Sequence, residues 1–209
     1  IDSVKSGCQN ISFEEFVVDN GSNDDTVKII KEKYPWVKLI ENKQNIGFAA
    51  ANNLAAKMSS GEFLLFLNPD TRVEEEFFSK LLEEFARNKQ MAILGPRLRT
   101  SLGNIQEWSA GCEVTLWDLL RNNIGLAGSK KVWKSSLKRE AHWVSGAALA
   151  IRKEVFQKLG GFDEQFFMYF EDIDLCKRVR ALGKKVYYSP ELTVFHIGGG
   201  SHMREKNKK

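Results

Sequence analysis

The sequence is poor in cysteine, has no long apolar run and carries a nearly balanced charge. Its three cysteines are isolated. Without metal-site spacing they exclude a disulfide scaffold or a zinc ribbon and favour a reducing compartment. No apolar run approaches bilayer-spanning length or has the pattern of a signal peptide, so any membrane contact is expected to be peripheral. The net charge of +4, from 31 basic and 27 acidic side chains, is too small to indicate nucleic-acid binding.

What the chain does contain is an ordinary globular composition, with 43 % apolar and 28 % charged residues. We find no internal repeat. The length favours a single domain, which we expect to cover residues 1–201, followed by a basic tail over residues 202–209.

Short apolar strands alternate with amphipathic helices along the chain. Residues 63–67 are a continuous apolar run, typical of a strand covered on both faces, and residues 48–58, 77–85 and 171–182 have helical character. This alternation predicts an α/β layer structure with a largely parallel sheet. Residues 96–139 have no clean period and are expected to be a variable insertion. The other predicted strands are residues 13–18, 37–40, 91–95, 143–151, 185–188 and 192–195.

Polar residues follow three of the predicted strands. Asp19, Asp70 and His196 each come at the carboxyl end of a strand, where open α/β sheets bind ligands. Asp19 can accept a hydrogen bond from a nucleobase or a ribose hydroxyl, and Gly21 allows close approach of the backbone. The open alternative for this turn is an Asx-type turn that caps the next helix.

The turn at residues 68–70 has the chemistry of a metal site. The carboxylate of Asp70 is a ligand for a hard divalent cation, Asn68 is a neutral helper and Pro69 stiffens the turn. Such a cation neutralises the charge of a diphosphate. His196, beside a glycine-rich stretch, could ligate the metal or bind phosphate. An ordinary turn and a structural histidine are the alternatives.

Two neighbouring carboxylates, Glu171 and Asp172, begin an amphipathic helix. They follow an aromatic run over residues 166–170, and apolar surroundings raise a carboxyl pKa toward that of a useful general base. The helical period does not decide which carboxylate faces a substrate, and acidic residues are also common at helix starts. Arg178, in the same helix, could touch phosphate or pair with Asp174.

Six short motifs follow one another in order, with His196 and its glycines after them: residues 17–22 (Val-Val-Asp-Asn-Gly-Ser), 45–53 (Asn-Ile-Gly-Phe-Ala-Ala-Ala-Asn-Asn), 66–71 (Phe-Leu-Asn-Pro-Asp-Thr), 145–147 (Ser-Gly-Ala), 160–163 (Gly-Gly-Phe-Asp) and 171–175 (Glu-Asp-Ile-Asp-Leu). Together they resemble family 2 glycosyltransferases of the GT-A fold, nearest to the rhamnosyltransferase-like members. The similarity extends from about residue 13 to residue 201. It implies a Rossmann-like mixed, mostly parallel sheet flanked by helices.

The resemblance implies a role for each motif. Asp172 would be the general base that deprotonates an acceptor hydroxyl. Asp70 would hold Mg²⁺ or Mn²⁺, with His196 as a metal or diphosphate contact. The implied reaction is an inverting displacement on a nucleotide-diphosphate sugar, in which the metal offsets charge on the leaving diphosphate. The residues expected around the donor are Asp19, which would contact the base, and Asn20, Ser22, Asn45, Gly47, Asn53, Asn68, Asp70 and Arg178.

The chain departs from the family pattern at two places. The family's opening strand, some thirty residues before the turn at Asp19, is expected to be missing, because the chain begins at Ile1. Asn68 replaces the first Asp of the metal motif, which lowers the charge of the site by one. The first departure keeps open a non-catalytic nucleotide-sugar-binding domain. A nucleotidyltransferase is disfavoured, because its glycine-rich basic start motif is absent.

The resemblance also suggests the partners. It favours dTDP-rhamnose and then UDP-sugars as donors, and a glycan or lipid-linked acceptor of bacterial surface polysaccharide synthesis. The expected location is the cytoplasm, with peripheral contact at the inner face of the membrane. Residues 96–139 would set the acceptor. Trp108, Trp117 or Trp133 could stack on sugar rings there, and a buried core position is the more common role for any one of them.

Overall fold

The computed structural model describes residues 1–8, 10–113 and 132–197. An N-terminal part contains α1 (Asp2–Gly7), β1 (Phe16–Asp19), α2 (Thr26–Lys33), β2 (Lys38–Glu41) and α3 (Phe48–Met58). The middle contains β3 (Phe63–Leu67), β4 (Thr71–Val73), α4 (Phe77–Arg87), β5 (Met91–Arg99), β6 (Ala110–Gly111) and the 3₁₀ turn η1 (Val132–Lys134). The last part contains β7 (Arg139–Ala141), β8 (Trp143–Val144), β9 (Ala148–Arg152), α6 (Lys153–Lys158), α7 (Glu171–Ala181) and β10 (Lys185–His196).

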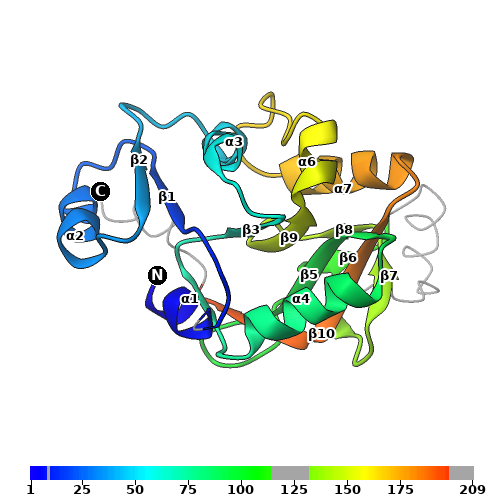
Figure 1. Ribbon diagram of the computed structural model, residues 1–209. Helices are drawn as coiled ribbons and strands as arrows, with labels where there is room; N and C mark the ends of the chain where they lie inside the picture. The colour runs from blue at the N-terminus through cyan, green and yellow to red at the C-terminus, as the bar shows by residue number, and fades with distance from the viewer. Residues whose placement is uncertain (9, 114–131, 198–209) are drawn as a thin grey trace, which may run out of the picture.

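Strands β1 and β2 form a small parallel sheet of their own. They pair in register from Phe16 with Lys38 to Asp19 with Glu41, with α2 as the connection between them. Figure 1 shows this unit at one end of the molecule, beside α3. Among the described residues no strand precedes β1. Asp19 is the last residue of β1, so the turn after it lies at the carboxyl end of this sheet.

The large sheet has six strands in the order β3-β9-β5-β10-β4, with β7 also paired to β10. The expected mixed α/β sheet is confirmed. Strands β3, β5 and β10 share one direction, because β9 is antiparallel to both β3 and β5 while β10 is parallel to β5. Within this sheet β5 and β10 are the one parallel pair of direct neighbours, and β4, β7 and β9 run the opposite way. A third, two-stranded sheet pairs β6 with β8.

Helices cover both faces of the large sheet. Figure 1 shows α4 on one side of it and α3, α6 and α7 on the other. Successive side chains of β9 point to opposite faces of the sheet, so this strand contributes to the core on both sides. Leu149 and Ile151 belong to the cluster under α6 and α7, whereas Ala148 and Ala150 belong to the cluster under α4. The small alanines leave room for the fully buried ring of Phe85.

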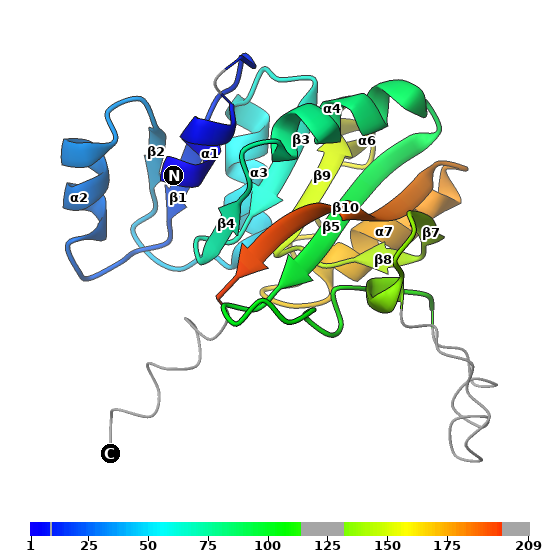
Figure 2. The ribbon, with the colours of Figure 1, turned by 90° about the horizontal axis from the view of Figure 1, so that it is seen from below.

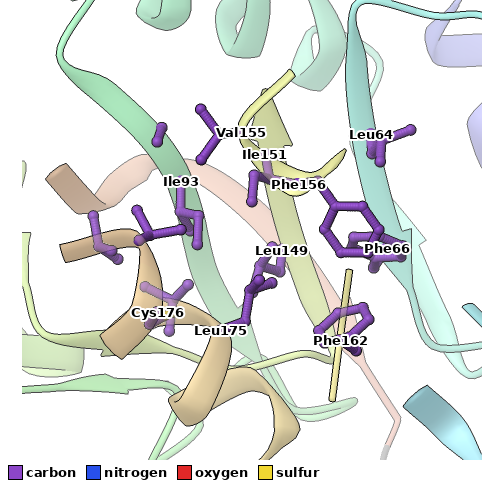
Figure 3. Close-up of a cluster of buried hydrophobic side chains, with 14 of the residues drawn as sticks. Leu64, Phe66, Ile93, Leu149, Ile151, Val155, Phe156, Phe162, Leu175 and Cys176 are labelled. Atoms are coloured by element: carbon purple, nitrogen blue, oxygen red, sulfur yellow. The ribbon is translucent and has the colours of Figure 1, made fainter. Parts of the chain in front are cut away.

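The core beneath α6 and α7 is rich in aromatic rings. Phe66, Phe156 and Phe162 lie with ring centroids 4.8–5.3 Å apart, a separation at which aromatic pairs stabilise beyond their buried area. Figure 3 shows these rings beside Leu149 and Leu175. The loop before α7 is therefore attached to the core at Phe162, which is 2 % exposed.

The predicted elements agree with most of the structure, and three predictions are corrected. The strands predicted at residues 185–188 and 192–195 are one strand, β10, with a register shift between Ser189 and Thr193. The strand predicted at residues 143–151 is divided into β8 and β9 by a turn at residues 145–147. Helix α1 and strand β4 were not predicted. In the expected insertion, residues 114–131 lie outside the described chain, as does the predicted tail at residues 202–209.

Candidate active site

The turn between β3 and β4 meets the end of β10. Strand β4 runs antiparallel to β10 with Thr71 opposite His196, and the Ile197 N–H donates to the Asp70 carbonyl at 2.9 Å. His196 Nε2 lies 3.2 Å from Asp70 Oδ1 and 3.5 Å from Asn68 Nδ2. The three residues expected at the metal and diphosphate therefore form one cluster at the carboxyl ends of β3 and β10.

Gln106, which sequence reasoning missed, orients the imidazole of His196. Its Oε1 atom lies 2.9 Å from His196 Nδ1. When Nδ1 donates its proton to this oxygen, Nε2 presents its lone pair toward the carboxylate of Asp70. A ligating histidine is commonly held in this way by a hydrogen bond on its other nitrogen. Gln106 lies in the aperiodic segment, so no pattern could have indicated it.

The donor set of this cluster suits a hard divalent cation that a substrate helps to hold. It combines a carboxylate, an imidazole and an amide, all partly buried. Within residues 1–8, 10–113 and 132–197, no group of three or more His, Cys, Asp or Glu residues could hold a metal by itself. Mg²⁺ and similar ions often bind through one or two carboxylates together with substrate phosphates. The residues therefore fit a cation shared with a diphosphate.

Asp172 lies next to this cluster through the turn at residues 145–147. The Gly146 N–H donates to Asp172 Oδ2 at 2.7 Å, and the Asn68 N–H donates to the Ala147 carbonyl at 3.0 Å. The turn at residues 145–147 therefore makes hydrogen bonds both to Asp172, the candidate general base, and to Asn68 of the turn at residues 68–70. A Cβ on Gly146 would stand 3.4 Å from Asp172 Cβ, which is ordinary van der Waals contact.

Burial changes the acidity of both carboxylates at the start of α7. Burial raises the pKa of Asp172, and the backbone N–H groups of Gly146 and Ile173 only partly oppose this. Burial also raises the pKa of Glu171, partly opposed by its own N–H and reinforced by the charge of Asp172. Glu171 is 5 % exposed, and its Oε2 atom has no hydrogen-bond partner in the part of the chain that the structure describes. The side chain of Asp172 is less buried than that of Glu171 and accepts the Gly146 N–H.

Glu171→Gln should stabilise the free protein at neutral pH by about 1 kcal/mol, or about 2–4 °C, because it removes a buried charge. The raised folded-state pKa of Glu171 fixes the pH dependence. Below about pH 4 the carboxyl is protonated in both folded and unfolded chains, so the gain vanishes. It grows as the pH rises through the folded-state pKa. Thermal unfolding from pH 4 to pH 8 measures it, with the exposed Glu83→Gln as control. An equal gain at pH 4 would contradict this explanation.

The turn after β1 adopts the Asx geometry that the sequence left open. Asp19 is 6 % exposed, and its Oδ2 accepts the N–H groups of Gly21 and Ser22, both at 3.1 Å. The Asn20 side chain donates to the Gly47 carbonyl at 3.2 Å and accepts from Asn42 Nδ2 at 2.9 Å. The Asx turn and its neighbours therefore form a fixed polar edge at the end of β1.

Gly47 connects this edge to the loop before α7. Its N–H donates to Asn45 Oδ1 at 2.9 Å, and its φ of +87° favours glycine. A Cβ there would lie 2.6 Å from the Phe167 carbonyl, which accepts the Phe48 N–H at 2.8 Å. The ring of Phe48 in turn reaches 3.5 Å from the Cβ position of Gly146. A chain of contacts thus joins the turn at β1 to the residue that binds Asp172.

Two of the expected donor residues, Asn53 and Arg178, make hydrogen bonds to the segment before α7 and within α7. Asn53 is 4 % exposed. It exchanges hydrogen bonds of 2.9 Å with the backbone of Phe162 and also donates to Glu164 at 3.0 Å. Arg178 pairs with Asp174 at 2.6 Å, which was the alternative for it, and donates to the Leu159 carbonyl. Both fasten the segment before α7, and their contact with a donor stays a prediction.

The comparisons with known proteins agree with this geometry. The sequence profile described as Glycosyl transferase family 2 matches residues 1–160. The chain belongs to this family. It is a glycosyltransferase, and a second profile, the N-terminal domain of galactosyltransferase, matches residues 128–206.

Two relatives are named as rhamnosyltransferases. The glycosyltransferase is 28 % identical to the N-acetylglucosaminyl-diphospho-decaprenol L-rhamnosyltransferase of Mycobacterium tuberculosis, over 90 % of this chain and 68 % of the relative. It is 24 % identical to the rhamnosyltransferase WbbL of Escherichia coli, over 93 % of this chain and 78 % of the relative. The expected rhamnosyltransferase-like resemblance is therefore confirmed.

Solved structures confirm the GT-A type of fold. GalNAc-T7, solved with UDP, GalNAc and Mn²⁺, matches with a TM-score of 0.66 and 17 % identity, over 88 % of this chain and 37 % of its own. The mannosyltransferase of Pyrobaculum calidifontis, solved with GDP-Man and Mn²⁺, matches with a TM-score of 0.65 and 16 % identity, over 98 % of this chain and 54 % of its own. In the described part of the glycosyltransferase, no helix is long and apolar enough to cross a bilayer.

Proposed function

We propose that this glycosyltransferase moves a sugar from a nucleotide-diphosphate donor to a hydroxyl of a glycan or lipid-linked acceptor, with inversion at the anomeric carbon. One observation carries the proposal. The turn at residues 145–147 binds Asp172 through Gly146 and the metal turn through Ala147 and Asn68. Because consecutive residues of one turn bind both groups, a base for the acceptor and a site for the leaving diphosphate can act on the same sugar.

The cluster at the ends of β3 and β10 would hold the diphosphate. Asp70 and His196 would bind a divalent cation, Mn²⁺ or Mg²⁺, with the Asn68 amide beside them. Such a cation stabilises the charge that develops on a leaving diphosphate. Gln106 keeps the imidazole in the orientation that presents Nε2. Asn68 in place of a carboxylate leaves the protein with less negative charge of its own here.

Asp172 would act on the acceptor. Its carboxylate accepts the proton of the acceptor hydroxyl as the oxygen bonds to the anomeric carbon and the bond to the diphosphate oxygen breaks. Attack from the face opposite the leaving group inverts the configuration. A raised pKa suits a carboxylate that must take a proton from a hydroxyl. The Gly146 N–H fixes the carboxylate in place before the acceptor arrives.

The nucleotide would lie along the polar edge after β1. Asp19, Asn20, Ser22 and Asn45 line two turns that are joined at Gly47. The Asx turn supports this role, because its hydrogen bonds fix the carboxylate and expose backbone groups to a nucleobase or ribose.

The names of the relatives guide the proposed substrates. The mycobacterial and Escherichia coli relatives are named as rhamnosyltransferases, which favours dTDP-rhamnose as the donor, with UDP-sugars as the next choice. The mycobacterial name specifies an N-acetylglucosaminyl diphosphate on a prenyl lipid, and a lipid-linked acceptor is proposed here by analogy. Such an acceptor would bring the enzyme to the cytoplasmic face of a membrane as a peripheral protein.

A thermal-shift screen tests the proposed donor and metal. The protein is heated with dTDP-rhamnose, UDP-N-acetylglucosamine or GDP-mannose, each with Mn²⁺, with Mg²⁺ or with a chelator. A bound donor at about 100 times its Kd stabilises by about 2.7 kcal/mol, or about 5–10 °C for a chain of this size. We expect this shift for one donor and only with metal. No shift with any donor would contradict the proposal, and a shift without turnover would favour a binding domain.

A further inference from the structure

Three aromatic residues have a backbone conformation that is unusual for them. Among the described residues other than glycine, only Trp108, Tyr169 and Phe170 have positive φ values, of 57°, 70° and 71°. Such conformations are strained for bulky side chains and persist where the surroundings or the function demand them. All three are exposed, by 67 %, 58 % and 65 %. Strain and exposed apolar area both oppose stability, so a function is indicated.

Trp108 lies between the two halves of the active site. Two residues before it, Gln106 binds His196. One residue after it, the Ser109 carbonyl accepts the N–H of Ser145, which is the neighbour of Gly146. The backbone around Trp108 is therefore fixed on one side to the diphosphate cluster and on the other to the turn that binds the base.

Tyr169 and Phe170 lie close to Asp172 along the chain. They end the loop that precedes Asp172, and this loop is anchored by the Phe48 N–H on the Phe167 carbonyl and by the Asp174 N–H on the Phe170 carbonyl. Figure 2 shows this loop and the segment after β5 at the sheet edge where β5 and β10 end. Hydrogen bonds hold the backbone of both segments in place, while the side chains of Trp108, Tyr169 and Phe170 stay exposed to solvent.

The indole of Trp108 has a support on one side. Its ring lies on that of Trp133, with centroids 5.1 Å apart and planes at 38°. Trp133 is 3 % exposed and its carbonyl accepts the Tyr188 hydroxyl at 3.0 Å. A buried, fixed ring underneath holds the exposed indole in one orientation, with area free for a ligand. Of the tryptophans considered for sugar stacking, Trp108 is therefore exposed and Trp133 is a buried core residue. Trp117 lies outside the described residues.

We propose that Trp108, together with Tyr169 and Phe170, binds the acceptor sugar by stacking on the apolar face of its pyranose ring. This proposal rests on the proposed function. The occupant follows from the neighbours: Phe170 lies two residues before Asp172 in the chain, and the residue beside Trp108 is Glu107, paired with Lys134. Apolar area next to a few fixed polar groups suits a sugar, with its C–H face and its hydroxyls. An anionic membrane would instead attract a basic patch.

Trp108→Gly is the decisive variant. Glycine accepts the positive φ, so the relief of backbone strain should offset the lost contact with Trp133 and the unfolding temperature should change little, while the stacking surface is lost. We expect the KM for N-acetylglucosaminyl diphosphate on a short prenyl chain, and for octyl N-acetylglucosaminide, to rise about tenfold. The KM for the donor and the metal-dependent donor shift should not change. Trp108→Phe should restore most of the acceptor affinity, and Trp36→Ala, at an exposed tryptophan beyond β1, should leave both KM values unchanged.

Three outcomes would overturn the inference. One is an unchanged acceptor KM in Trp108→Gly. A second is a loss of unfolding temperature in Trp108→Gly, with the acceptor KM restored once the protein is refolded in glycerol, which would make the indole structural. The third is loss of binding to vesicles containing 30 % anionic lipid with an unchanged KM for octyl N-acetylglucosaminide, which would make it a membrane contact. Absence of any donor shift in the unmodified protein would instead contradict the proposed function.

Discussion

Asp172→Asn should lower the rate of sugar transfer by about 10²–10⁴-fold, the usual contribution of a positioned general base. The amide keeps the shape of the side chain and can still accept the Gly146 N–H through its oxygen, so the turn and the metal cluster should remain. Donor affinity, measured by the metal-dependent thermal shift, is therefore expected to persist. The loss should appear in kcat, because an interaction made only during reaction is removed.

Glu171→Gln distinguishes the two neighbouring carboxylates. Glu171 is buried, and among the described residues its Oε2 atom has no hydrogen-bond partner. We expect less than a tenfold loss of rate from Glu171→Gln under conditions in which Asp172→Asn loses at least 10²-fold. Glu83→Gln, an exposed carboxylate paired with Arg87 on α4, is the control for a charge change alone. If Glu171→Gln instead lost more activity than Asp172→Asn, Glu171 would be the general base.

The activity of the unmodified enzyme should depend on pH in a matching way. Burial raises the pKa of Asp172, and only the ionised carboxylate accepts a proton. The rate of transfer is therefore expected to fall as the pH drops through this raised pKa. In Asp172→Asn the remaining rate should lose that dependence.

The sequence predicted the cluster at Asp70 and His196 because of a rule about sheets. Ligand sites gather at the carboxyl ends of strands, and both residues follow strong apolar strands. The strand that brings them together could not be predicted. Thr71–Val73 of β4 has three residues, too few for a period, and is defined by its pairing with β10. The sequence therefore indicated the two residues, Asp70 and His196, but not the pairing of β4 with β10 that brings them together.

Other parts of the site depend on choices that local sequence leaves open. Arg178 had two partners available, and the structure shows the one four residues away, because an i,i+4 pair needs no other element. Trp108 and Trp133 looked alike in sequence, yet one is exposed and the other buried. Both lie in a segment without periodicity, where only the folded surroundings decide burial.

Some short motifs were informative because their residues have few alternatives. Gly47 has a positive φ and touches the Phe167 carbonyl, so only glycine fits. Gly21 also has a positive φ, and a Cβ there would lie 3.0 Å from Gln44 Cα. These positions could be recognised as special from the sequence, while their partners could not.

Asp70→Ala should abolish the metal-dependent stabilisation by the donor and lower kcat/KM by about 10²–10³-fold. A cation at a leaving diphosphate contributes several kcal/mol, and each 1.36 kcal/mol is a factor of ten. Asp70 supplies the carboxylate of the cluster, so its loss leaves only His196 and Asn68. Titration of Mn²⁺ against a fixed donor concentration, followed by thermal shift, measures the effect. Glu74→Gln, an exposed carboxylate just after β4, is the matched control.

The converse change should strengthen the same site. Asn68→Asp adds a second carboxylate beside Asp70, and hard cations bind more tightly as the charge of their ligands increases. We expect half-saturation at a lower Mn²⁺ concentration, by about threefold to tenfold, with the donor held constant. Asp70→Ala with undiminished metal dependence, together with Asn68→Asp without any gain, would place the cation elsewhere. Opposite responses of these two variants require the cation to lie between β3 and β10, where His196 meets the turn.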